Sequence, residues 1–184
     1  MIALPSAGRY TLHAETGGQG TGDYAFRLNT LTEQSLSLGQ RHDDIFPTSD
    51  AGLLYSVEIT EENPLRIQLE DNDPSDYVQM YVARDILPTR RDHLYRSTEV
   101  AASHDLTVPR AVPGTWYIWV VGRHVDDGNP FAITVDSQSS FVDQVSPALA
   151  IADPEVTLQI DGIGFRPSVE VALVSSTGSV IDSI

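Results

Sequence analysis

Residues 114–122 read "GTWYIWVVG", a run of aromatic and branched side chains that follows a proline and lies between two glycines. Successive side chains along a strand point to opposite faces. Trp116, Ile118 and Val120 are therefore expected to share one face, because they alternate with period two. The stretch predicts a β-strand with this face in a hydrophobic core.

The beginning of the chain repeats the same phrase. When Gly8 is aligned with Gly114, "GRYTLHA" falls on the alternating pattern of "GTWYIWV". A second alternating stretch follows each copy, "YAFRL" in the first and "FAITV" in the second. This repetition of two strands and the turn between them indicates a module of roughly a hundred residues that recurs along the chain.

Period-two alternation also marks the segments between the two copies, whereas no long segment has the spacing of an amphipathic helix. Three sets of alternating apolar residues would each lie on one face of a strand: Leu53, Tyr55, Val57 and Ile59, then Leu65, Ile67 and Leu69, then Val78, Met80 and Val82. Short strands separated by turn signals are typical of a sandwich or barrel. The predicted fold is all-β, with antiparallel β-sandwich modules of jelly-roll or immunoglobulin-like type in tandem and no significant helix.

The repeats and a Ser/Gln-rich stretch near residue 138 divide the chain into three parts. Residues 1–29 are expected to be the closing hairpin of one module, and residues 30–138 a complete sandwich. Residues 139–184 are expected to be the incomplete start of a third, immunoglobulin-like module.

The composition excludes several functions. Eleven basic residues, all arginine, stand against 26 acidic residues and give a net charge of −15. Such a surface repels phosphate backbones and anionic lipid headgroups, so binding to nucleic acid or to a membrane surface is disfavoured. Neither an apolar run of membrane-spanning length nor a secretion signal is visible. The absence of cysteine excludes disulfides and thiolate metal sites.

Residues 36–136 resemble the bacterial pre-peptidase C-terminal domain. The resemblance lies in "YSVEI", "PLRIQLED", "VQMYVARDILPTRRD", "PGTWYIWVVG" and "NPFAITV". The first 28 residues resemble the end of another copy, and "VSP" with "VTLQIDGIGF" resembles the start of an IPT/TIG domain. Gln79 stands where the family commonly has Asp, so no metal role is carried over to that position.

The resemblance implies a non-catalytic accessory module of a secreted or cell-surface protein. It names no ligand. We find no G-x-S-x-G or H-E-x-x-H motif, and the five histidines lack the spacing of metal ligands. The chain is therefore expected not to be an enzyme and to require no cofactor.

The loop "LEDNDPSDY" is the strongest candidate for a metal site. It gathers four side chains with the oxygen ligands that Ca²⁺ prefers, namely Asp71, Asn72, Asp73 and Asp76, although its spacing is not that of an EF-hand. The alternative is a turn rich in Asp, Asn and Pro that joins two strands. A second acidic loop, with Asp126, Asp127 and Asn129, has the same two interpretations.

Tyr117 and Trp119 are the candidate ligand-binding residues, because they would point away from the core face of their strand. An aromatic pair on an exposed sheet face can hold a protein or polysaccharide ligand. The alternative is that a neighbouring module or loop covers this face. Arg90, Arg91 and Asp92 are expected to form salt bridges within their loop.

Two functions follow from the sequence. The first is a structural spacer segment of a large bacterial extracellular or cell-surface protein. The alternative is an accessory module that binds an extracellular polymer, with calcium stiffening a loop. The open-ended outer parts suggest further that neighbouring modules or identical chains add strands to one another, which would extend into a filament.

Overall fold

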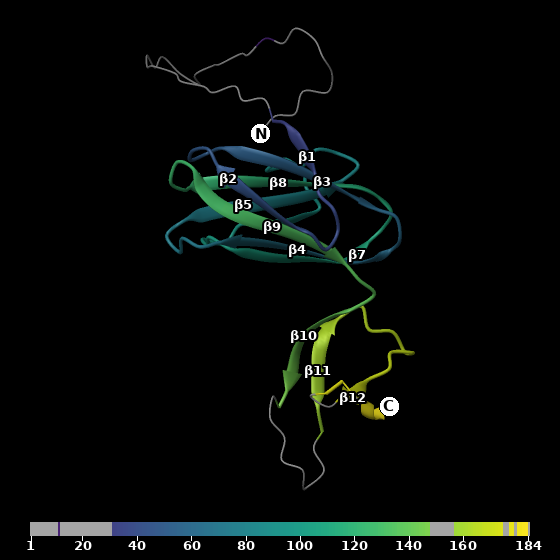
Figure 1. Ribbon diagram of the computed structural model, residues 1–184. Helices are drawn as coiled ribbons and strands as arrows, with labels where there is room; N and C mark the ends of the chain where they lie inside the picture. Colours follow the sequence, from purple (N-terminus) through teal and green to yellow (C-terminus); the bar gives the residue numbers. More distant parts are fainter. Residues whose placement is uncertain (1–10, 12–30, 148–156, 175–176, 179, 184) are drawn as a thin grey trace, which may run out of the picture.

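The computed structural model describes residues 11, 31–147, 157–174, 177–178 and 180–183. Two β-sheets form its main body, packed face to face as a sandwich (Figure 1). One sheet has five strands in the order β1-β3-β8-β5-β6, and the other has four in the order β2-β9-β4-β7. In the described part of the chain no residue is helical, and no helix could cross a membrane.

The strands of the first sheet are β1 (Glu33–Ser35), β3 (Gly52–Ile59), β5 (Tyr77–Arg84), β6 (Tyr95–Ser97) and β8 (Gly114–His124). Those of the second sheet are β2 (Arg41–Phe46), β4 (Asn63–Asp71), β7 (His104–Ala111) and β9 (Asn129–Ser137). Every pair of neighbouring strands is antiparallel except β1 and β3, which run parallel. The all-β sandwich predicted from the sequence is confirmed.

Strand β8 occupies the middle of the five-stranded sheet. It pairs with β3 on one side, from Gly52 opposite Val121 to Ile59 opposite Gly114, and with β5 on the other. Both of its faces are covered, which explains the apolar character of the whole run from Trp116 to Val121. The stretch that reveals the fold in the sequence is therefore its central strand.

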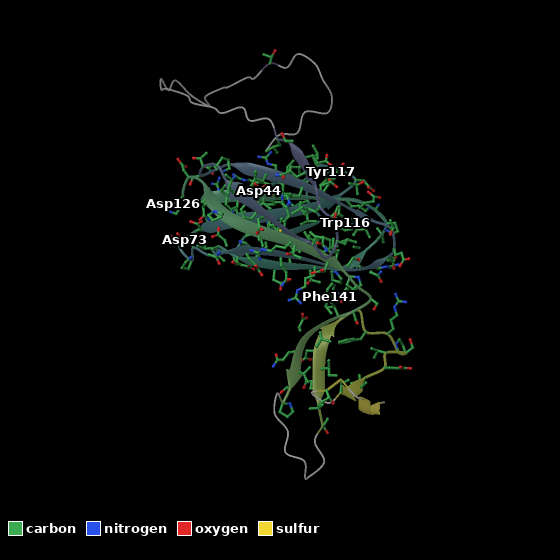
Figure 2. The ribbon with its side chains drawn as sticks, viewed as in Figure 1. Asp44, Asp73, Trp116, Tyr117, Asp126 and Phe141 are labelled. Carbon is green, nitrogen blue, oxygen red and sulfur yellow. The ribbon has the colours of Figure 1, made fainter. Side chains whose placement is uncertain are left out.

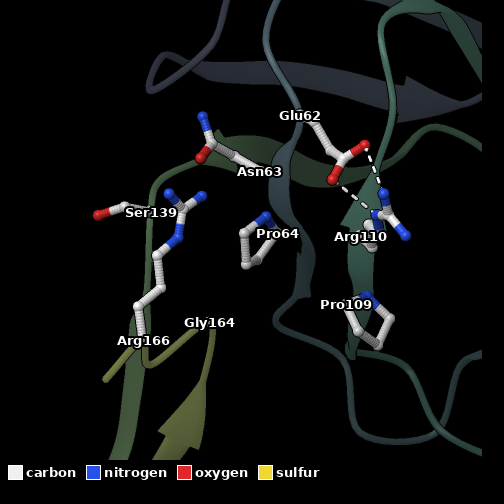
Figure 3. Close-up of a pocket in the computed structure, with 8 residues that line it drawn as sticks. All are labelled: Glu62, Asn63, Pro64, Pro109, Arg110, Ser139, Gly164 and Arg166. Carbon is white, nitrogen blue, oxygen red and sulfur yellow. Dashed lines mark hydrogen bonds and ion pairs between the residues drawn. The ribbon is translucent and has the colours of Figure 1, made fainter. Parts of the chain in front are cut away.

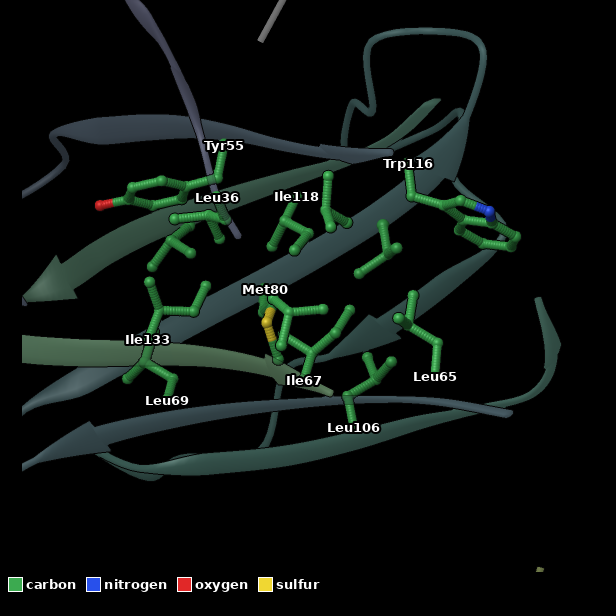
Figure 4. Close-up of a cluster of buried hydrophobic side chains, with 14 of the residues drawn as sticks. Leu36, Tyr55, Leu65, Ile67, Leu69, Met80, Leu106, Trp116, Ile118 and Ile133 are labelled. Atoms are coloured by element: carbon green, nitrogen blue, oxygen red, sulfur yellow. The ribbon is translucent and has the colours of Figure 1, made fainter. Parts of the chain in front are cut away.

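The main core lies between the two sheets (Figure 4). The predicted inward positions of β8, namely Trp116, Ile118 and Val120, are all buried in it. So are the alternating apolar residues of β3, β4 and β5, with Leu53 only partly buried at the rim. Period-two alternation thus identified the inner faces of β3, β4, β5 and β8.

A second, smaller unit follows the sandwich. Strand β9 ends at Ser137, and β10 (Phe141–Ser146) pairs with β11 (Gln159–Ile163) in an antiparallel hairpin below the sandwich in Figure 1. Strands β12 (Ala172–Val174) and β13 (Val180–Ser183) form another antiparallel pair. The predicted hairpin of residues 1–29 lies outside the described residues, apart from Thr11. The division into three modules stays a prediction.

Candidate functional site

Two acidic side chains meet at one end of the sandwich. Asp71 ends β4, Asp76 immediately precedes β5, and Asn129 begins β9. The Nδ2 amide of Asn129 donates hydrogen bonds to Oδ2 of Asp71, at 2.9 Å, and to Oδ2 of Asp76, at 2.6 Å. Asp73 and Asp126 lie at the same end (Figure 2). One side-chain amide therefore holds two carboxylates from different strands together.

Both carboxylates are buried, and Asp76 is only 4% exposed. Burial, followed by the negative charges of Asp71, Asp73 and Asp126, raises the pKa of Asp76 to about 6. Above this pH the ionised carboxylate of Asp76 is repelled by the neighbouring negative charges, and a proton or a cation would reduce this repulsion.

The other two predicted metal ligands take different roles. The carboxylate of Asp73 accepts hydrogen bonds from the backbone N–H of Ser75, at 2.9 Å, and from its hydroxyl, at 2.6 Å. These bonds lower the pKa of Asp73 and make the local turn that the sequence offered as its alternative. Asn72 is exposed. Of the four predicted ligands, only Asp71 and Asp76 are brought together.

A calcium ion in a protein takes six to eight oxygen ligands. The described residues bring no group of three His, Cys, Asp or Glu side chains into a metal-binding arrangement. Asn129 also turns its N–H groups, rather than its oxygen, toward the two carboxylates. The arrangement does not fit a complete calcium cage, and the calcium site stays a prediction.

The aromatic face of the first sheet is closed over rather than open. Trp119 is 4% exposed and stacks on Tyr81, with ring centroids 5.3 Å apart. They form a second buried cluster with Leu54 and Val121, against which Tyr117 is partly buried. Tyr117 and Trp119 do point away from the main core, as predicted, but Trp119 offers almost no surface to a ligand.

The indole nitrogen of Trp119 is buried without a hydrogen-bond partner. It points at Gly52, where an added Cβ would overlap the nitrogen. A glycine is therefore needed opposite the indole for steric reasons. The sequence of residues 114–122 shows no sign of this requirement, since the glycine lies on another strand.

A buried histidine site was missed in the sequence. His104 at the start of β7 has its Nδ1 atom 2.7 Å from the hydroxyl of Ser97, whose Oγ also lies 3.1 Å from Glu99. Its Nε2 atom lies 2.9 Å from the carbonyl oxygen of Val78 and 3.2 Å from that of Ala101. Both ring nitrogens are committed to holding β6 and the following loop against β5, which is a structural role.

A second polar cluster links the two sheets. The hydroxyl of Tyr55 in β3 donates a 2.7 Å hydrogen bond to Asp44 in β2, and Gln34 of β1 donates another at 2.6 Å. Burial acts to raise the pKa of Asp44, but the hydrogen bonds from Tyr55, the Ile45 backbone and Gln34 outweigh it and lower this pKa. Burial and the same carboxylate raise the pKa of Tyr55.

The loop salt bridges predicted for Arg90 and Arg91 are not formed, since neither side chain has a carboxylate partner among the described residues. The Thr89 hydroxyl instead accepts hydrogen bonds from the backbone N–H groups of Arg91 and Asp92. These bonds shape the loop through its backbone and leave its charged side chains exposed.

A small pocket of about 150 Å³ lies between the sandwich and the loop after β11 (Figure 3). Its lining residues are Glu62, Asn63, Pro64, Pro109, Arg110, Ser139, Gly164 and Arg166. Arg110 and Glu62 form a two-point ion pair on its wall, at 2.6 and 3.0 Å. Small-molecule sites are usually about 300–1,000 Å³, so the pocket is small even for a compact ligand.

No family model and no curated protein matches the chain. Among solved structures, the chain is similar to the pre-peptidase C-terminal domain of a collagenase from Bacillus anthracis, with a TM-score of 0.46 and 10% identity over 61% of this chain and 100% of that one.

It is also similar to PliG of Aeromonas hydrophila, a periplasmic inhibitor of g-type lysozyme, with a TM-score of 0.42 and 14% identity over 59% of this chain and 97% of that one. At these identities the likeness concerns the fold alone. The IPT/TIG resemblance of the last segment stays a prediction. The sandwich is similar to a pre-peptidase C-terminal domain, the family that the sequence of residues 36–136 resembles.

Proposed function

We propose that this chain is a non-catalytic structural segment of a large bacterial extracellular or cell-surface protein, and that its sandwich acts as a spacer. The observation that carries the proposal is the use of its buried polar side chains. His104, Ser97, Asp71 and Asp76 each hold one part of the sandwich to another through hydrogen bonds. These groups serve the fold rather than a cleft.

The course of the chain supports the same role. It enters the sandwich at β1 and leaves after β9 toward β10 on another side of the molecule (Figure 1). Such a path suits modules arranged one after another. The sequence resemblance to a domain of secreted proteins supports the location.

The test is a binding and hydrolysis assay on insoluble matrices. The purified chain is mixed with chitin, cellulose, peptidoglycan and collagen, with serum albumin as the reference protein. A spacer leaves the bound fraction at the level of albumin and releases no sugar or peptide. Release of sugar or peptide by an activity that co-purifies with the chain through a second purification step would contradict the proposal.

A second candidate is an accessory module that binds a protein or polysaccharide at Tyr117. The partly exposed ring of Tyr117 beside the buried Trp119 cluster supports it. Tyr117→Ala tests it better than Trp119→Ala, because removal of a buried indole would also disturb the fold. Matrix binding that Tyr117→Ala abolishes, with an unchanged melting temperature, favours this candidate over the spacer.

Calcium stiffening of the acidic end belongs to this second candidate. The buried pair Asp71 and Asp76 supports it, since both carboxylates lack a cationic partner among the described residues. Millimolar calcium should raise the melting temperature of the wild type at pH 7.5, but not that of Asp76→Asn. Magnesium at the same concentration is the control, and an equal rise with both ions would indicate charge screening only.

Strand addition between neighbouring modules or identical chains, and the filament it would build, is proposed from the sequence patterns alone. Light scattering over a concentration series, with and without calcium, tests it. A molar mass that climbs with concentration supports assembly, and a constant mass near 20.1 kDa contradicts it.

A further inference from the structure

The described arginines fall into two groups. Arg41, Arg66, Arg84, Arg110 and Arg123 each lie within 4.0 Å of a carboxylate. Four others have no such partner in the described part of the chain, and three of them lie close together in sequence, at positions 90, 91 and 96. In a chain with 26 acidic residues and eleven arginines, three neighbouring arginines without partners are an unexpected arrangement.

The same segment exposes large apolar side chains. Ile86 is 56% exposed, Leu87 38% and Leu94 59%, all in the connection from β5 to β6. Single exposed apolar residues are ordinary, but three in one short segment beside free guanidinium groups are a patch. We call Ile86, Leu87, Arg90, Arg91, Leu94 and Arg96 the arginine loop.

The arginine loop is held in shape at both of its ends. At the first end, Asp85 exchanges hydrogen bonds with Thr115, from its N–H to the carbonyl oxygen at 2.8 Å and back to its carboxylate at 3.2 Å. At the other end, the N–H of Leu94 donates to the carbonyl oxygen of Val82 at 2.8 Å.

The middle of the loop is also fixed. The N–H of Thr89 donates to the carbonyl oxygen of Asp92 at 2.7 Å. The ring of His93 packs edge-on against Tyr81 of the sheet, with centroids 5.4 Å apart, and its Nδ1 lies 3.1 Å from the Thr89 carbonyl oxygen. A surface that is already ordered loses little conformational entropy when a partner binds.

The residue types of this loop indicate the kind of partner that it would bind. Guanidinium groups bind carboxylates through paired hydrogen bonds, and arginine is enriched in protein-binding hot spots. A polyphosphate backbone would use only the arginines and would meet the repulsion of a chain with a net charge of −15. Charges farther away than about 8 Å are largely screened at physiological salt. Within the segment, Asp85 pairs with Arg84, and the exposed Asp92 offsets one of the three unpaired arginines, so an acidic partner meets a local excess of positive charge.

We propose that the arginine loop is a docking surface for an acidic protein surface in which carboxylates flank an apolar contact. The three arginines would pair with the carboxylates, and Ile86 and Leu94 would cover the apolar contact. This interaction is separate from the spacer role and from the aromatic face around Tyr117.

The test follows amide chemical shifts of the isotope-labelled full chain while a random glutamate–tyrosine copolymer is added at about 150 mM salt. Poly-glutamate and heparin are the comparison probes. We expect shifts confined to residues 85–97, with the copolymer binding more tightly than either comparison probe. Shifts spread over the molecule, absence of binding, or equal binding of heparin would overturn the proposal.

Two variants and one matched control sharpen the result. The triple variant Arg90→Ala, Arg91→Ala, Arg96→Ala should weaken copolymer binding by about ten-fold or more. The control Arg41→Ala, Arg110→Ala, Arg123→Ala changes the net charge equally but removes paired arginines, and it should bind within about two-fold of the wild type. Equal losses in both would show that only net charge matters.

The variant Ile86→Ser, Leu94→Ser should lose the preference for the copolymer over poly-glutamate. It should still bind both polymers through its arginines. An unchanged preference would overturn the apolar part of the proposal. Sedimentation velocity of the free chain tests whether a second copy of the chain is the partner. Self-association that the triple arginine variant abolishes would show that it is. This result would overturn the proposal of a different acidic protein.

Discussion

Three polar side chains meet at the acidic end of the sandwich. Asp76 is buried next to Asp71, and the Asn129 amide is their shared hydrogen-bond donor. The two aspartates were visible in the sequence as members of one acidic loop. Their partnership with Asn129 was not, because that residue belongs to another loop and arrives only when β9 packs beside β4.

Asp76 should make the folded chain less stable as the pH rises. Its pKa is raised to about 6 in the fold, against about 3.9 in an unfolded chain, so the folded state holds the proton more strongly. The stabilisation is complete below about pH 4 and is lost as the pH rises through 6. Asp76→Asn should therefore raise the melting temperature at pH 7.5 and leave it nearly unchanged at pH 4.

Thermal denaturation of both proteins from pH 4 to pH 8 measures this difference. Asp127→Asn is the control, since this exposed residue of the neighbouring turn should show no such pH-dependent gain. A constant difference between Asp76→Asn and the wild type across the pH range would contradict the prediction.

Gly52 is the second residue whose identity the fold requires. Gly52→Ala should lower stability by about 1–3 kcal/mol, because the new methyl group overlaps the buried Trp119 indole. Chemical denaturation measures the loss. Gly128→Ala is the comparison: nothing lies near its missing side chain, and its φ of 76° costs only about 1 kcal/mol of backbone strain.

At the scale of elements, hydrogen bonds from side chains hold short strands that have few ladder bonds of their own. Strand β1 spans three residues and, within the part of the chain that the structure describes, pairs only with β3. Gln34 anchors it further by donating to Asp44 of β2, which also accepts from Tyr55 of β3. One carboxylate thus links three strands and both sheets.

Tyr55→Phe should therefore cost about 1.5–3 kcal/mol, the usual worth of a hydrogen bond to a charged group. The ring packing is unchanged, so the loss comes from the Asp44 carboxylate, which keeps Gln34 and the Ile45 backbone as donors but loses the Tyr55 hydroxyl. Chemical denaturation measures it, with Tyr95→Phe as the control, since Tyr95 is partly buried but has no hydroxyl hydrogen bond within the described structure. Equal effects of both variants would show that Asp44 does not depend on Tyr55.

The central strand should dominate the stability of the sandwich. Ile118→Ala removes three buried carbons between the sheets and should cost about 2–5 kcal/mol. Val142→Ala in β10 changes an exposed side chain outside the sandwich and should cost less than about 1 kcal/mol. Amide hydrogen exchange should also be slowest in β8, and faster exchange there than in β10 would be inconsistent with its central position.

At the scale of the whole molecule, charge repulsion is the dominant long-range term. With a net charge of −15, compact folding brings many like charges together, and salt screens them. Raising sodium chloride from about 0.01 to 0.5 M should therefore raise the melting temperature, since surface ion pairs contribute little in comparison. Calorimetry at pH 7.5 measures the shift, and a fall with added salt would mean that the arginine ion pairs outweigh the repulsion.

The sequence by itself determined the long strands β3, β4, β5 and β8, their inward faces and the class of fold. Trp116, Ile118 and Val120 revealed the core side of β8 because alternation is a local property of the chain. The sequence also showed that Asp71 and Asp76 belong to one acidic loop.

Only the tertiary structure decided which distant residues meet. The Asn129 amide between two carboxylates and the glycine opposite Trp119 both depend on strand order across the sheets. The salt bridges that Arg90 and Arg91 lack depend on the fold of their own loop. Local patterns carry no information about which strands become neighbours, because hydrophobic burial is non-directional and many pairings would bury the same faces. Packing between particular strands selects one of them, and the polar contacts follow from that choice.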